Sequence, residues 1–175
     1  LYREVKEIAA GLIDLGPTPG ERVAILSENC KEWIYCDIAI IMAGGVTVPL
    51  YDTYGPEEVT YLLNHSQTRF LFLSGRTQTR KIQEAESNLE SLQGVISFVK
   101  EGENLTLPLY TLEELKARGR ERLKKNPREL ENRASMASPE QLATIVYTSG
   151  TTGTPKGAMI THGNILAVAR AIDEI

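Results

Sequence analysis

Short apolar runs alternate with helical patterns through the first hundred residues, and this alternation restricts the fold more than any other feature of the sequence. Four such runs are expected to form strands, at 23–26, 46–50, 69–73 and 95–99. Apolar runs bounded by turn residues are typical of strands buried on both faces of a parallel sheet. Helices are expected between them, over 1–15, 30–43, from 56 onward, and 76–92. The sequence therefore predicts an α/β fold in which a mostly parallel sheet is flanked by helices.

Two helical segments carry more detailed expectations. The helix over 30–43 is apolar almost all round, with Ile34 and Ile38 among its side chains, so we expect it to be sandwiched between other elements. Residues 100–110 are expected to form a loop. The heavily charged residues 112–135 are expected to form a solvated helix and linker, because charges of both signs are interleaved along them.

The C-terminal part of the chain begins with a strand at 142–147 that runs into a loop, YTSGTTGTPKG, at 147–157. A short returning strand is expected at 157–160 and a final helix from 161. The C-terminal part is therefore a strand–loop–strand–helix segment. We accordingly divide the chain into an α/β subdomain (1–110), a charged helix and linker (111–140) and the start of a second subdomain (141–175).

The loop at 147–157 has the composition of an anion-binding loop. Its glycines let backbone N–H groups approach a ligand closely, its hydroxyl side chains add donors, and Lys156 adds a positive charge. Such a loop directly after a strand suits a polyphosphate, most simply a nucleotide. It matches neither common nucleotide loop, because Lys156 follows Pro155 and precedes Gly157 and because it contains no G-x-G-x-x-G. The alternative is a Gly/Thr hairpin without a ligand, in a purely structural α/β domain.

The acidic balance of the chain limits its partners. A net charge of −4 at pH 7 and a pI near 5.3 argue against nucleic acid. The longest apolar run, 38–46, is too short to span a bilayer, and no basic amphipathic helix supports peripheral membrane contact. Cys30 and Cys36 do not form a CxxC pair and indicate free thiols in a reducing compartment, so we expect a cytoplasmic protein.

The string YTSGTTGTPKGAMITHGN, at 147–164, resembles the phosphate-loop signature of the adenylate-forming superfamily, which includes acyl-CoA synthetases, peptide-synthetase adenylation domains and luciferases. Residues 15–74 are also similar to that superfamily's N-terminal region in order and spacing, and VPLYDTYGPEE, at 48–58, is most similar to long-chain fatty acyl-CoA synthetases. The resemblance implies a two-step reaction. A carboxylate attacks the α-phosphate of ATP to give an acyl-adenylate and pyrophosphate, and the thiol of coenzyme A then attacks the adenylate.

The resemblance also assigns roles to residues of the loop. Thr148 carries over as a phosphate contact and a neighbour of Mg²⁺. Lys156 carries over as a phosphate contact. We expect no catalytic residue within this chain, with Lys156 as the alternative. The motif positions that would contact the β- and γ-phosphates of ATP are Ser149, Gly150, Thr151, Thr152 and Gly153.

Four other features are interpreted as structural. His162 follows the loop, but a histidine at the start of a helix is more often structural than catalytic. The segment 51–53 follows a strand end, where we expect a turn or a subdomain contact. Trp33 is expected in the core, and His65 on the surface or in packing.

The segments that the superfamily uses for adenine, ribose, Mg²⁺ and the catalytic lysine lie downstream of the phosphate loop, and none has a match here. We therefore expect the N-terminal part of an AMP-forming fatty acyl-CoA synthetase (an acid–thiol ligase), inactive alone and self-associating through exposed apolar faces. Its partners would be ATP, a fatty acid or other carboxylate, coenzyme A and the remainder of the enzyme. Two alternatives stay open: another adenylate-forming ligase, for aryl acids or amino acids, and a non-catalytic nucleotide-binding module.

Overall fold

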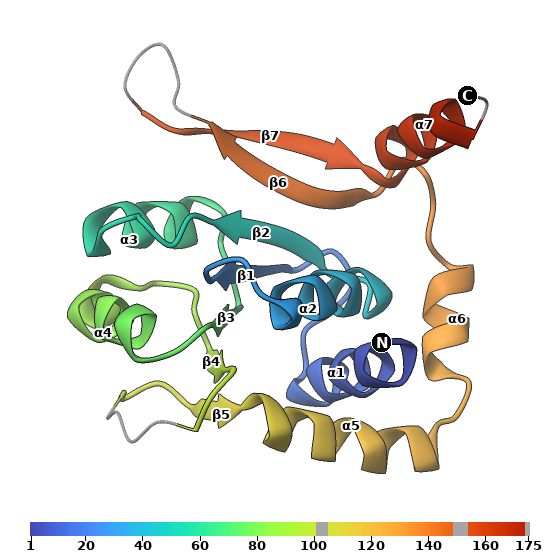
Figure 1. Cartoon of the computed structure of the whole chain (residues 1–175), viewed down its shortest axis with the longest axis horizontal. Helices are drawn as coiled ribbons and strands as arrows, with labels where there is room; N and C mark the ends of the chain where they lie inside the picture. The colour runs from blue at the N-terminus through green and yellow to red at the C-terminus, as the bar shows by residue number, and fades with distance from the viewer. Residues whose placement is uncertain (101–104, 149–153, 174–175) are drawn as a thin grey trace.

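A single sheet runs through the described residues and carries helices on both faces (Figure 1). The computed structural model describes residues 1–100, 105–148 and 154–173. The strands are β1 (Arg22–Leu26), β2 (Val46–Leu50), β3 (Phe70–Leu73), β4 (Gly94–Ser97), β5 (Leu109–Thr111), β6 (Leu142–Thr148) and β7 (Lys156–Thr161). The helices are α1 (Tyr2–Leu15), α2 (Lys31–Met42), α3 (Pro56–His65), α4 (Arg76–Ala85), α5 (Leu112–Lys125), α6 (Glu129–Ser135) and α7 (His162–Asp173), with a 3₁₀ turn η1 (Glu86–Asn88).

The strand order is β5-β4-β3-β1-β2-β6-β7. Neighbouring strands are parallel, except that β6 and β7 form an antiparallel hairpin at one edge. The predicted mostly parallel sheet is therefore confirmed. The prediction of a loop over 100–110 is wrong at its end, because β5 extends the sheet there and is too short to leave a pattern in the sequence.

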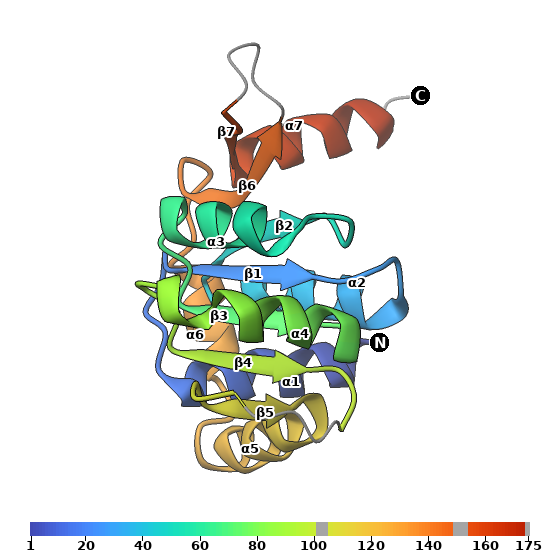
Figure 2. The ribbon, with the colours of Figure 1, turned by 90° about the vertical axis from the view of Figure 1, so that its left-hand side faces the viewer.

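The central strands are buried on both faces, as their apolar runs indicate. In β1, Val23 and Ile25 belong to the core on the side of α1 and α2, whereas Ala24 and Leu26 belong to the core on the side of α3 and α4. All four are fully buried. Figure 2 shows α3 and α4 in front of the sheet and α1 and α2 behind it. The alternation of side chains along each strand thus builds two separate cores.

The prediction that α2 is sandwiched is wrong. Its buried residues are Cys36, Ala39 and Ile40, whereas Ile34 is 53% exposed and Ile38 is 38% exposed. The helix packs one side against α1 and the sheet and leaves the other side open. Apolar character all round a helix therefore does not by itself imply cover on all sides.

The charged residues 112–135 are helical, as expected, and most of their charged side chains are exposed, but the expectation of a solvated segment missed a buried face. They form α5 and α6, and α5 packs along α1 with Leu115 fully buried. Lys116 is 9% exposed, and its ammonium lies 2.9 Å from the carboxylate of Glu4 and 2.6 Å from that of Glu113. Several charged side chains of α5 thus form ion pairs with α1 at the interface between the two helices.

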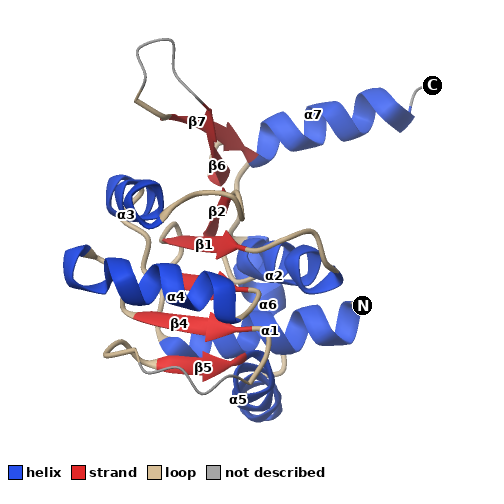
Figure 3. Ribbon diagram, turned by 60° about the vertical axis from the view of Figure 1, so that its left-hand side comes forward, coloured by secondary structure: helices blue, strands red, loops and turns tan. Residues whose placement is uncertain are grey.

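The hairpin of β6 and β7 forms one edge of the sheet, and the helix α7 extends outward from it (Figure 3). The hairpin joins the sheet through β2. The Thr144 hydroxyl donates a hydrogen bond to the carbonyl oxygen of Thr47, with 2.9 Å between the two oxygens. Met159 of β7 is 69% exposed and Val168 of α7 is 62% exposed. In the part of the chain that is described, no helix has the length and apolar character needed to cross a membrane.

Candidate functional site

The end of β6 and the start of β7 meet where the sequence predicts a phosphate site. Thr148, the last residue of β6, is paired across the ladder with Lys156, the first residue of β7. Residues directly opposite each other in an antiparallel pair have Cβ atoms about 4.5–5.5 Å apart on the same face. Both residues are exposed. The structure therefore brings these two predicted residues together at the carboxyl end of β6.

The remaining predicted phosphate contacts lie outside the described residues, so their role stays a prediction. They are Ser149, Gly150, Thr151, Thr152 and Gly153.

Tyr147 joins this end of the hairpin to α3. It is 4% exposed, and its hydroxyl lies 2.7 Å from Nδ1 of His65. Burial raises the pKa of the Tyr147 hydroxyl, so the hydroxyl keeps its proton at neutral pH. The imidazole tautomer sets which of the two groups donates in this bond. Tyr61, one turn before His65, lies with its ring centroid 5.4 Å from that of His65, and its hydroxyl donates to the carbonyl oxygen of Pro155 over 3.4 Å. We call Tyr61, His65 and Tyr147 the stem cluster, since it links α3 to both sides of the hairpin beside the Thr148–Lys156 pair.

Gly157 makes room for the stem cluster. It is the cross-strand partner of Tyr147. A Cβ atom at this position would lie 2.8 Å from Cγ2 of Ile145 and 3.3 Å from Cζ of Tyr147. The tyrosine ring therefore passes over a residue without a side chain, which explains on packing grounds why glycine follows Lys156.

A cavity of about 290 Å³ lies at the carboxyl ends of three parallel strands. Ligand crevices of α/β sheets form at this edge, outside the carboxyl ends of the strands. Tyr147 belongs both to the stem cluster and to the cavity wall, so the cavity adjoins the predicted phosphate site. The lining residues are Ser27, Asn29 and Trp33 from the β1–α2 segment, Pro49, Leu50, Tyr51 and Asp52 from the end of β2, and Val146 and Tyr147 from β6.

A hydrogen-bonded network connects the segments that follow β1, β2 and β3 to α4. The carboxylate of Glu28 accepts hydrogen bonds from the Ser74 hydroxyl and, at 2.8 Å, from Nε2 of Gln78. The bond from Ser74 is the main cause that lowers the pKa of Glu28. The ammonium of Lys81 donates to the carbonyl oxygen of Asp52 over 2.5 Å and holds the turn after β2 against α4. This side of the strand ends is therefore closed by the protein's own side chains.

Trp33, expected in the core, is only partly buried against it and also lines the cavity. Asp52 and Thr53 form a turn, as predicted, but Tyr51 and Asp52 also line the cavity. His162 is the first residue of α7, at the opposite end of β7 from Lys156, so it does not lie beside Thr148. His65 is exposed, as predicted. Its hydrogen bond to Tyr147, 82 positions away in the sequence, could not be predicted from the residues around either partner.

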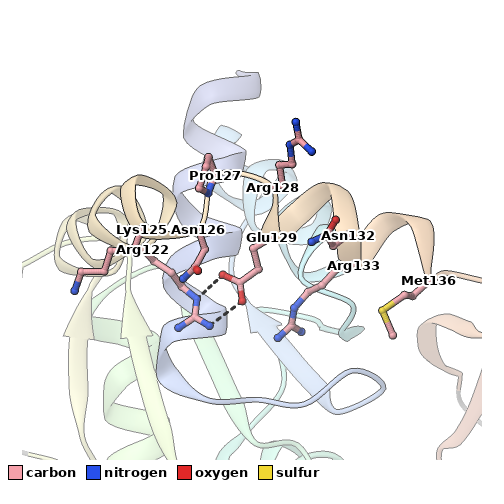
Figure 4. A pocket seen from close by; sticks show the side chains of 9 residues that line it. All are labelled: Arg122, Lys125, Asn126, Pro127, Arg128, Glu129, Asn132, Arg133 and Met136. Atoms are coloured by element: carbon pink, nitrogen blue, oxygen red, sulfur yellow. Dashed lines mark hydrogen bonds and ion pairs between the residues drawn. The ribbon is translucent and has the colours of Figure 1, made fainter.

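Figure 4 shows a larger pocket of about 630 Å³ between α5 and α6, lined by basic side chains. Its Arg122 is engaged by both carboxylate oxygens of Glu129, at 2.7 and 2.8 Å. The guanidinium of Arg133 donates a hydrogen bond of 2.8 Å to the carbonyl oxygen of Ala43, just before β2 begins. The pocket therefore lies toward the amino ends of the strands, away from Thr148, and its two inner arginines are already used.

The described residues hold no group of three or more His, Cys, Asp or Glu side chains that could bind a metal ion. Cys30 and Cys36 are free thiols, as expected. Within residues 105–148 and 154–173, Thr148 is the hydroxyl assigned to a metal ion, which would need further oxygen ligands such as those of a bound phosphate.

Comparison with known proteins decides the family. The family model described as "AMP-binding enzyme" matches residues 1–175. The chain belongs to the AMP-binding enzyme family. A long-chain-fatty-acid–CoA ligase of Mycobacterium bovis is 34% identical over 163 residues, which are 93% of this chain and 26% of the relative. A long-chain-fatty-acid–CoA ligase of Xenopus laevis is 32% identical over 170 residues, 97% of this chain and 23% of the relative. This AMP-binding chain thus spans about a quarter of the length of these relatives.

Solved structures show the same AMP-binding fold. An anthranilate CoA ligase in complex with anthranoyl-AMP superposes with a TM-score of 0.78 at 24% identity, covering 96% of this chain and 30% of that one. The A-PCP didomain of a carboxylic acid reductase from Segniliparus rugosus, in complex with AMP, superposes with a TM-score of 0.80 at 22% identity, covering 94% of this chain and 25% of that one. At these identities the likeness concerns the fold.

Proposed function

We propose that this chain is the N-terminal part of an AMP-forming long-chain fatty acyl-CoA ligase, and that the segment from Thr148 to Lys156 holds the β- and γ-phosphates of ATP. The substrates of the intact enzyme would be ATP, a fatty acid and coenzyme A. The observation that carries the proposal is the pairing of Thr148 with Lys156 beside a cavity at the strand ends, in a chain of the AMP-binding family. The names of the relatives favour a long-chain fatty acid over an aryl acid or an amino acid.

The chemistry asked of these residues is positioning and charge stabilisation. When a carboxylate attacks the α-phosphate, negative charge develops on the departing pyrophosphate. The ammonium of Lys156 and the hydroxyl of Thr148 would stabilise that charge without needing to rearrange. Mg²⁺ would arrive with the nucleotide and take most of its ligands from phosphate oxygens, with Thr148 as a neighbour.

We further propose that these 175 residues do not complete adenylation alone. The relatives are about four times as long, and the described residues supply no metal-binding cluster. The exposed apolar side chains of β7 and α7 also support self-association of the isolated chain, since apolar patches of this kind favour association. Sedimentation that shows a monomer at all concentrations would count against that association.

The test of the function is pyrophosphate exchange into ATP that depends on added fatty acid. The protein that carries this chain within a full-length ligase should exchange, and the 175 residues alone should not. Exchange supported by benzoate or by an amino acid, and not by a long-chain fatty acid, would replace the fatty acid ligase by another adenylate-forming ligase. MgATP binding without any exchange in either protein would favour a nucleotide-binding module.

A further inference from the structure

The stem cluster joins one helix, α3, to both sides of the hairpin at the end where Thr148 and Lys156 are paired. Tyr61 and His65 are four positions apart on α3, so their side chains lie on the same face of that helix. One reaches Pro155, the residue before β7, and the other reaches Tyr147, the residue before Thr148. The helix thus spans the two strands where they approach Thr148 and Lys156.

Three observations indicate that this geometry is specific. The Tyr147 ring lies edge-on to His65, with ring centroids 5.7 Å apart and an interplanar angle of 77°. The hydroxyl–nitrogen distance of 2.7 Å is that of a full hydrogen bond. Gly157 leaves the space that the Tyr147 ring occupies. A change at any of these positions would shift the strand ends against each other.

We propose that Tyr61 and His65 are positioning residues that hold Thr148 and Lys156 in register for a polyphosphate ligand. The proposal rests on the proposed function for the identity of that ligand. Neither side chain is among the phosphate contacts proposed above. They act through Tyr147 and Pro155, whose backbones continue directly into Thr148 and Lys156.

A purely structural role for the cluster makes a different prediction. The hairpin joins the sheet through β2 in any case, and His65 is exposed, so loss of its imidazole removes little packing. A structural role would therefore lower the melting temperature without a selective effect on ATP. A positioning role would change the response to ATP and leave the response to fatty acid alone.

The first experiment measures KM for ATP and for fatty acid in the full-length protein. His65→Leu and Tyr147→Phe should each raise the KM for ATP roughly five- to tenfold, the effect of one lost hydrogen bond, with the KM for fatty acid unchanged. The double variant should resemble either single variant, because both remove the same bond. His65→Asn places an amide oxygen near the position of Nδ1 and should recover the wild-type KM to within about twofold.

The matched control is Tyr110→Phe, which removes a tyrosine hydroxyl from β5 at the opposite edge of the sheet and should leave both KM values unchanged. Equal effects of His65→Leu and Tyr110→Phe, or equal increases in both KM values, would overturn the proposal.

A second experiment does not depend on catalysis. Amide ¹⁵N–¹H spectra should show that His65→Leu shifts the signals of Thr148 and Lys156, whereas Tyr110→Phe leaves them in place. If the wild-type protein shows no exchange reaction but these shifts occur, the function proposed above fails and the positioning survives. If exchange is normal and both amides stay unmoved in His65→Leu, the positioning fails and the function survives.

Discussion

Gly119 of α5 lies directly against the backbone of Glu7 on α1. A Cβ atom at Gly119 would lie 1.8 Å from the carbonyl oxygen of Glu7. The contact is matched one turn away, where a Cβ atom at Gly11 would lie 2.1 Å from the carbonyl oxygen of Leu115. The two helices therefore meet backbone to backbone, and the ion pairs along them, such as Arg120 to Glu7 at 2.8 Å, follow from that close approach.

We expect Gly119→Ala to destabilise the protein by about 3 kcal/mol, because the added methyl group collides with backbone that can move only if the helices separate. Helix propensity alone predicts the opposite sign, a gain of about 1 kcal/mol. Urea denaturation decides between them by the sign of the change in unfolding free energy. Ala117→Gly, at an exposed position of the same helix, measures the propensity effect without the collision. A stabilised Gly119→Ala protein would show that the helices are not in contact.

This interface explains why the sequence predicts only part of the fold. The buried strands and α1 are predictable because their apolar spacing is local. The role of α5 is not, because its signal is a pair of glycines on helices more than a hundred positions apart, and glycine in a charged segment equally suits a linker. The same applies to α2, whose apolar residues do not reveal which side the rest of the protein covers.

The ion pair between Glu129 and Arg122 should make stability depend on acid pH. Two hydrogen bonds from Arg122 lower the pKa of Glu129 below its ordinary value of 4.5. A carboxylate with a lowered pKa in the folded state stabilises it above the unfolded pKa, and that contribution is lost as the pH falls through the folded pKa. Glu129→Gln should therefore cost about 1 kcal/mol at pH 7 and nothing once the pH lies well below 4.5.

Chemical denaturation of the wild type and Glu129→Gln at a series of pH values tests this dependence. Glu131→Gln is the matched control, since Glu131 is an exposed residue of the same helix, α6. It should leave the unfolding free energy unchanged at every pH. A cost of Glu129→Gln that persists at low pH would mean that the carboxylate charge is not what links α6 to α5.

The candidate site is predictable to a similar degree. The loop composition and the family resemblance identify Thr148 and Lys156, and the structure pairs them across the hairpin. The bond between His65 and Tyr147 could not be predicted, because it depends on how α3 lies against β6 and not on any spacing within the chain. The cavity at the strand ends likewise needs three strands in their final order.

Gly157→Ala should weaken ATP binding without unfolding the protein. The added Cβ atom would approach the Tyr147 ring and Ile145, and the ring would have to tilt away from His65. We expect a loss of about 1–2 kcal/mol in stability and a several-fold increase in the KM for ATP. Ala158→Thr is the control, because the next residue of β7 points to the other face and is exposed. Equal KM values for ATP in Gly157→Ala and wild type would show that Gly157 has no role in ATP binding.

Lys156 offers the most direct test of the phosphate site. Lys156→Met keeps the length and the apolar stem of the side chain and removes its charge. If the ammonium stabilises the pyrophosphate, the change should lower kcat/KM for ATP about 10- to 100-fold, the value of a charge-assisted hydrogen bond. Lys156→Arg should recover part of this loss, because it restores the charge with a different geometry. Lys124→Met removes an exposed charge from α5, whose ammonium pairs with Glu121 at 2.6 Å, and should leave kcat/KM unchanged. A Lys156→Met protein with wild-type ATP dependence would leave Thr148 and the backbone to hold the phosphates, and Lys156 would then serve only to begin β7.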